Sequence, residues 1–190
     1  MKNILRPALV LFASLTVLTG LLYPLAVTGA AQAVFSSQAA GSLVQRNGHT
    51  VGSALIGQSF SAPGHFWGRP SVTAPMAYNA AASGGSNQGP LNPALQDAVK
   101  ARIEALRAAD PGNTAAVPVD LITASSSGLD PHISIAAAHY QAARVARARS
   151  LPVATVTATI NKLVEQPLWG LLGEPRVNVL ALNLALDDAR

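Results

Sequence analysis

A long stretch without charge near the N-terminus constrains this chain more than any other feature. Between Arg6 and Arg46 the sequence holds no charged side chain, and the segment Pro7–Thr28 is mostly apolar. An α-helix rises about 1.5 Å per residue, so about 20 apolar residues cross a hydrocarbon core of about 30 Å. The sequence therefore predicts a membrane-spanning helix, which we place at residues 7–29.

A cleaved signal peptide is the alternative interpretation of the same segment. Lys2 and Arg6 supply the basic start of a signal, and Ala31-Gln32-Ala33 offers a cleavage triplet. The apolar run exceeds the about 7–15 residues that are typical of a signal peptide, so we favour an uncut anchor. The chain has no Cys, which excludes a lipoprotein, because a lipoprotein needs a Cys at its cleavage site.

The position of the basic residues also predicts a topology. Lys2 and Arg6 precede the helix, so the N-terminus, residues 1–6, should stay in the cytoplasm. We then expect a single-pass membrane protein, with a stalk or linker at residues 30–48 and a domain at residues 49–190 that faces either a periplasm or an extracellular space.

Composition limits what that domain can do. After the anchor about 160 residues remain, enough for one compact domain with a real core. The net charge is +4, but Lys2 and Arg6 supply two of these charges, and no stripe of basic and aromatic residues follows. Nucleic acid is therefore not expected as a partner. The chain has no Cys and its four His lack ligand spacing, so we expect neither disulfides nor a metal site.

Helix signals are clearest in the second half of the chain. Asn92 followed by proline is typical of a helix start, and the apolar spacing predicts a helix over Pro93–Ala109. Ser134 predicts the N-cap of a second helix, Ile135–Arg149, and Pro152 begins a third.

Strand and loop signals lie between these helices. In the loop Phe60–Ser71 we expect Phe66 and Trp67 to fill the core, and the polar stretch Ala80–Pro93 predicts a long loop. Because strand and helix signals alternate loosely, the sequence predicts a small α+β domain. The predicted strands lie at Val117–Thr123 and Arg176–Leu182, and Thr50–Gln58, which mixes β-branched residues with glycine, predicts a short strand interrupted by bends.

A serine hydrolase is the enzymatic alternative. Ser126, Asp130 and His132 are the residue types of a nucleophile, an acid and a base. The G-x-S-x-G motif is missing, since Ala124 stands where glycine should precede Ser126. We keep a hydrolase that uses Ser126 and His132 as the alternative function. The non-catalytic interpretation of the same residues is a tight turn in which these side chains form hydrogen bonds with backbone amides.

Several strings taken together resemble the C-subunit family of the Kdp potassium-transporting ATPase, nearly from end to end. The most specific is Leu129–Ser134, whereas Ile135 departs from the proline usual after that serine. The other matching strings are Gly52–Gln58, Phe66, Arg69–Ser71, Ser83–Asn87, Gly89-Pro90, Asn92-Pro93, Val117–Leu121, Thr123–Ser125, Gln141, Arg144–Ala146, Ala148-Arg149 and Glu174–Val179.

The resemblance implies a non-catalytic accessory subunit of a high-affinity, ATP-driven potassium uptake pump. The partners implied are a channel-like potassium-binding subunit, a P-type ATPase catalytic subunit and a small single-helix subunit. Members of this family have one membrane helix and an external domain. They are thought to stabilise the complex and to act as a catalytic chaperone that raises the ATP affinity of the hydrolysing subunit.

The resemblance also implies where a nucleotide would bind. The contact falls on Ser127, Gly128 and Gln141, with ATP as a possible ligand and no firmly bound cofactor. The predicted topology puts Gln141 outside the cytoplasm, where ATP is scarce. Gln141 could equally bond backbone or a partner subunit, and the sequence leaves these roles open.

Overall fold

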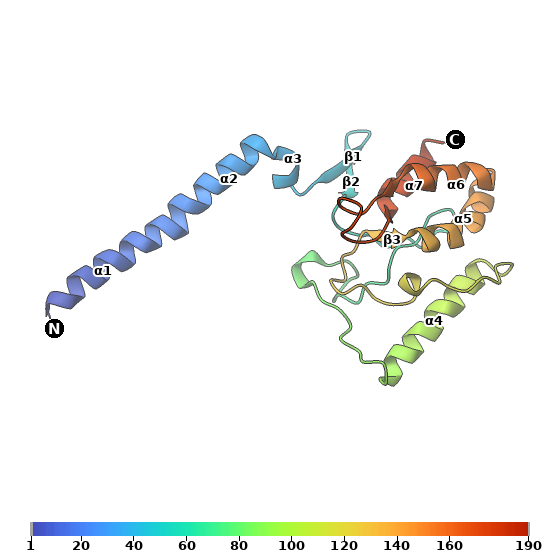
Figure 1. Cartoon of the computed structure of the whole chain (residues 1–190), viewed down its shortest axis with the longest axis horizontal. Helices are drawn as coiled ribbons and strands as arrows, with labels where there is room; N and C mark the ends of the chain where they lie inside the picture. The colour runs from blue at the N-terminus through green and yellow to red at the C-terminus, as the bar shows by residue number, and fades with distance from the viewer. Residues whose placement is uncertain (1, 190) are drawn as a thin grey trace. The chain divides into compact units, whose positions relative to one another are not determined.

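The computed structural model describes residues 2–189 and contains two compact units, one that ends at Val51 and one that begins at Gly52. The first unit begins with a long helix, drawn in blue in Figure 1. It consists of α1 (Lys2–Val17), a π-helical stretch (Leu18–Leu22) and α2 (Tyr23–Val34). The candidate membrane span Ile4–Val34 has 31 residues and includes the predicted anchor, which is therefore long enough to cross a bilayer.

The segment after the long helix differs from a simple stalk. A short helix, α3 (Ser36–Ala39), is followed by β1 (Leu43–Arg46), which pairs with β2 (His49–Ser53). Asn47 and Gly48 connect the two strands with φ angles of 51° and 78°. An Asn-Gly pair with positive φ at both positions is the preferred two-residue hairpin turn, so the local sequence explains this hairpin.

The second unit contains a small antiparallel sheet covered by helices. The sheet order is β3 (His132–Ser134), β5 (Arg176–Asn178) and β4 (Val164–Glu165), with Val177 of β5 opposite both Ile133 and Val164. Three helices pack in sequence, α5 (Ile135–Arg149) on α6 (Val153–Lys162) and α6 on α7 (Val179–Asp187). This arrangement confirms the α+β class (Figure 1).

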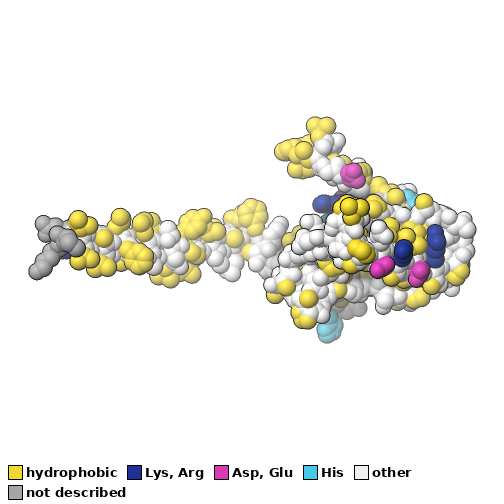
Figure 2. Space-filling model, turned by 90° about the horizontal axis from the view of Figure 1, so that it is seen from below, with side chains coloured by type: hydrophobic (Ala, Val, Ile, Leu, Met, Phe, Trp, Pro, Cys, Tyr) yellow, Lys and Arg dark blue, Asp and Glu magenta, His cyan; other side chains and the backbone are white. Residues whose placement is uncertain are grey.

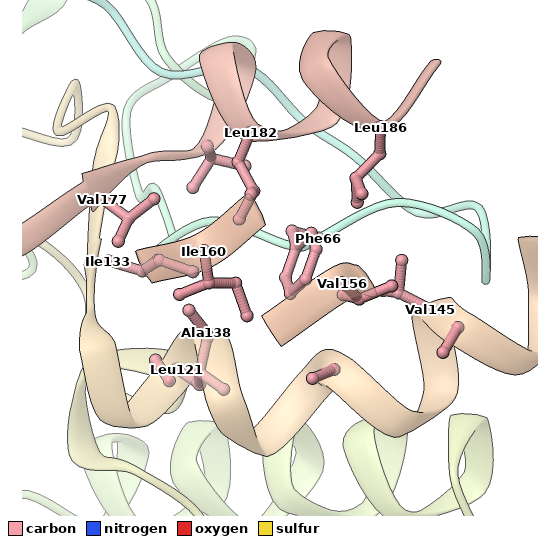
Figure 3. Packing of buried hydrophobic residues seen from close by; sticks show 14 of the residues in the cluster. Phe66, Leu121, Ile133, Ala138, Val145, Val156, Ile160, Val177, Leu182 and Leu186 are labelled. Carbon is pink, nitrogen blue, oxygen red and sulfur yellow. The ribbon is translucent and has the colours of Figure 1, made fainter. Parts of the chain in front are cut away.

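Phe66 fills the centre of the core, as predicted. It is fully buried, and Figure 3 shows its ring near Val156 of α6 and Leu182 of α7. Trp67 is partly buried and packs against the same cluster. The other buried hydrophobic residues of the cluster are Leu106, Leu121, Ile133, Ala137, Ala138, Ala142, Val145, Ala146, Ile160, Val177, Val179 and Leu186.

The helix predictions are confirmed. The helix α4 (Pro93–Ala109) has the predicted bounds, and the Asn92 side chain accepts a hydrogen bond from the amide of Ala94. Ser134 caps α5 by accepting from the amide of Ala137, and Pro152 immediately precedes α6.

The strand predictions are partly wrong. The segment Val117–Thr123 forms a 3₁₀ turn at Val119–Leu121, because the Asp120 carboxylate accepts two hydrogen bonds from Ser134 and holds the chain in a bend. In the segment Thr50–Gln58 the predicted short strand with bends is confirmed, since the strand stops at Ser53 and the next residues turn.

The last predicted strand, Arg176–Leu182, is a strand only as far as Asn178. The Asn178 side chain accepts a hydrogen bond from the amide of Ala181 and so becomes the N-cap of α7. A strand and a helix therefore share this asparagine, which also donates to the carbonyl of Ala54.

Candidate functional site

Four buried polar side chains of α5 and α7 bind the backbone of the loop at residues 63–67. We call these side chains, Gln141, Arg144, Arg149 and Asn183, the clamp. The side-chain oxygen of Asn183 accepts a hydrogen bond from the backbone amide of Phe66 at 2.8 Å, and its side-chain nitrogen donates one to the Phe66 carbonyl at 3.1 Å. This two-point contact fixes the path of the main chain that places Phe66 in the core.

Gln141 makes the same contact one residue further along. It accepts from the amide of Trp67 at 2.8 Å and donates to the Trp67 carbonyl at 3.1 Å. It also accepts from Arg144 at 2.7 Å and donates to the Ala137 carbonyl at 3.3 Å. A side-chain amide offers two donor hydrogens and one oxygen with two lone pairs. All of these are used, and Gln141 is only 1% exposed.

The two arginines of the clamp bind the preceding residues. Arg144 donates to the carbonyls of Pro63 and His65, and its guanidinium group lies 4.5 Å from the centre of the Trp67 ring. Burial lowers the pKa of Arg144 to about 10, so the group stays charged near neutral pH. Arg149 donates to the Gly64 carbonyl and pairs with Asp187 of α7 at 2.6 Å.

Ser127 and Gly128 form a turn that lies against a second loop. The Ser127 carbonyl accepts from the amide of Gly84 and the hydroxyl of Ser83, both at 2.9 Å. Gly128 has a φ angle of +68°, and a Cβ atom there would lie 2.4 Å from the Thr73 side chain and 2.9 Å from the Gly84 carbonyl. Glycine is therefore required at this position for the two loops to touch.

The three residues of the predicted nucleotide contact thus have separate surroundings. Within residues 2–189, the hydrogen-bond partners of Gln141 lie on α5 and on Trp67, whereas those of the Ser127 turn lie at Ser83, Gly84, Ser125 and Leu129. The structure gives Gln141 a role in holding backbone, which is one of the alternatives that the sequence left open.

A chain of charged and ionisable side chains runs beside the Ser127 turn. Arg69 pairs with Asp130 at 2.9 Å, and the two ring nitrogens of His132 lie 3.5 Å from Asp130 and 3.4 Å from Glu165. Burial favours protonation of Asp130, but the hydrogen bonds from His132 and Arg69 outweigh it and lower the pKa of Asp130 to about 2. Glu165 in turn pairs with Arg176 at 3.1 Å.

This chain of charges gives no support to the hydrolase alternative. Both ring nitrogens of His132 face carboxylates, so neither is directed at Ser126 as a base. Ser126 lies on the exposed part of its turn, where its backbone contacts Gly85 closely. The arrangement fixes loops against each other.

Arg144 and Arg149 lie within the strings that resemble the family, but nothing in the sequence assigned them a structural role, and Asn183 was not singled out. Asn183 interrupts the apolar stripe of α7, between Leu182 and Leu186. An asparagine in such a stripe is a signal of a buried hydrogen bond, since a buried amide needs partners.

The comparisons with known proteins cover almost the whole chain. A family model described as "K+-transporting ATPase, c chain" matches residues 5–188. A "Potassium-transporting ATPase KdpC subunit" of Variovorax paradoxus is 75% identical over 98% of this chain and 97% of its own length. A relative with the same description in Polaromonas naphthalenivorans is 73% identical over 98% of this chain and 95% of its own length. Another, in a Janthinobacterium species, is 64% identical over 99% of this chain and 100% of its own length.

Proposed function

Since this chain belongs to the K+-transporting ATPase c-chain family, we propose that it is the non-catalytic accessory subunit of a high-affinity, ATP-driven potassium uptake pump. The observation that carries this proposal is the match over residues 5–188, which includes both the apolar helix and the domain. A domain similar by fold alone would not share the membrane segment.

The proposed place of the chain is the inner membrane. The helix Ile4–Val34 would cross the bilayer once, with the N-terminus in the cytoplasm because Arg6 lies before most of the apolar stretch. The α+β domain would then face the periplasm. Its proposed partners are the channel-like potassium-binding subunit, the P-type ATPase catalytic subunit and the small single-helix subunit.

The proposed role is to stabilise the assembled pump and, as a catalytic chaperone, to raise the ATP affinity of the hydrolysing subunit. Direct nucleotide contact at Ser127, Gly128 and Gln141 stays a prediction. The use of every Gln141 hydrogen-bonding group within the domain favours an indirect effect on ATP affinity, exerted through assembly.

The test is recovery of the tagged full-length chain from membranes in mild detergent, with identification of the proteins that accompany it. The proposal expects the channel-like and ATPase subunits in near-equal amounts, together with potassium-stimulated ATP hydrolysis. Recovery of the chain alone from membranes that contain those subunits would contradict the proposal. The chaperone role is checked by the ATP dependence of hydrolysis with and without this subunit.

A further inference from the structure

The connection between β4 and β5 exposes four large apolar side chains within five residues. We call Leu168, Trp169, Leu171 and Leu172 the apolar tip. Their exposed fractions are 59%, 81%, 84% and 59%. Figure 2 shows a group of hydrophobic side chains that projects from the domain. Such a concentration of exposed apolar surface is typical of a protein or membrane contact.

Backbone hydrogen bonds close the apolar tip into a turn. The amides of Leu171 and Leu172 both donate to the Leu168 carbonyl, and the amide of Leu168 donates to the Leu172 carbonyl at 3.1 Å. Trp169 and Gly170 adopt φ angles of 55° and 73°, which closes the turn. Because β4 and β5 are paired, the tip is presented on a fixed base. Little conformational entropy would be lost when it binds.

Charged groups surround the base of the tip. Glu165 pairs with Arg176 and lies 3.4 Å from the ring of His132, and Glu174, two residues after Leu172, adds an exposed carboxylate. An apolar centre with a polar rim is the usual anatomy of a protein interface. The Glu165–Arg176 pair is neutral as a whole, whereas the exposed Glu174 carboxylate would be repelled by anionic lipid headgroups, so the charges favour a protein over the bilayer surface.

We propose that the apolar tip docks into a hydrophobic recess with a neutral or basic rim on another subunit of the same pump. The inference rests on the proposed function, because it requires a partner subunit outside the membrane. Trp169 is the central contact, since tryptophan dominates the binding energy of many interfaces. Leu171 fills the recess beside it, and the carboxylates of Glu165 and Glu174 meet its rim.

The test compares Trp169→Asn and Leu171→Asp with Leu91→Asp in the co-expressed full-length chain. Asparagine tolerates the positive φ angle of Trp169, and Leu91 is a matched control because it is an apolar residue that is 93% exposed elsewhere. We expect at least tenfold less accessory subunit to be recovered with the pump for both tip variants, and wild-type recovery for Leu91→Asp. Recovery of both tip variants at the level of Leu91→Asp would overturn the inference.

Tryptophan fluorescence separates a protein partner from lipid. The chain has two tryptophans, so the difference between the wild-type and Trp169→Phe spectra reports Trp169. We expect its emission to move to shorter wavelength in the assembled pump only. The same shift for the chain alone, in phosphatidylcholine or phosphatidylglycerol vesicles, would assign the tip to the membrane and refute a protein partner. If the wild-type chain fails to bring down any pump subunit, the proposed function fails instead.

Discussion

Replacement of Gln141 by alanine separates a scaffold role from a nucleotide role for this residue. The change removes both partners of the Trp67 backbone, since Gln141 holds its amide and its carbonyl. A buried polar group left without a partner costs about 1–3 kcal/mol, so two such groups cost about 2–6 kcal/mol. For a domain of this size each kcal/mol lowers the melting temperature by roughly 3–4 °C, which gives a loss of about 6–24 °C.

The assay is thermal unfolding of the detergent-solubilised full-length chain, followed by near-ultraviolet circular dichroism. Gln96→Ala is the matched control, because Gln96 is an exposed glutamine on α4, and it should melt with the wild type. Gln141→Met keeps the volume and removes the hydrogen bonds, so it should lose most of the same stability. At a temperature where the variant is folded, its assembled pump should retain the wild-type ATP affinity.

Two results would refute the scaffold argument. The first is a Gln141→Ala chain that melts within a degree of the wild type, because the clamp would then contribute nothing at this position. The second is a weaker ATP affinity in a pump that contains the folded variant at the normal ratio. That second result would restore the nucleotide contact that the family resemblance implies.

Three further predictions concern Gly128, Asp130 and Asn178. Gly128→Ala should lower the free energy of unfolding, measured in urea, by at least about 2 kcal/mol, because the φ angle and the close neighbours both oppose a side chain. Gly112→Ala is the control and should be near neutral, because a Cβ atom there meets open space. The lowered pKa of Asp130 means that its stabilising effect is complete above about pH 4 and is lost as the pH falls toward 2. Asp130→Asn should therefore cost at most about 2 kcal/mol of unfolding free energy at pH 7. In acid unfolding titrations the stability of the variant should converge with that of the wild type. Asn178→Ala should cost about 1–2 kcal/mol by the same urea assay, more than Asn92→Ala at the exposed start of α4.

The helices could be predicted from sequence because their signals are local. The start of α4 needs only Asn92 and Pro93, and α5 needs only the hydroxyl of Ser134 within its own first turn. The spacing of apolar residues then determines which face is buried. Neither feature depends on residues far away in the chain.

The strands and the clamp were harder because their partners are distant. The bend at Asp120 exists because Ser134 lies against it, and apolar neighbours alone suggest a strand there. In the sequence Gln141 is simply a polar residue within a predicted helix. Nothing nearby in the sequence indicates that its side chain binds the backbone of Trp67, which lies 74 residues earlier. The resemblance to a family identified these positions as special without giving the physical reason.

The clamp has a consequence for how substitutions should be tolerated. Its four side chains hold main-chain atoms of residues 63–67, and main-chain atoms are the same whatever side chain follows them. An exposed residue of that segment can therefore change its side chain without loss of its attachment. A change on α5 or α7, at Gln141 or Asn183, releases a segment encoded far upstream. Substitutions should therefore be tolerated at Pro63, the exposed residue of the segment, and not at Phe66 in the core or at the helix positions that hold the segment.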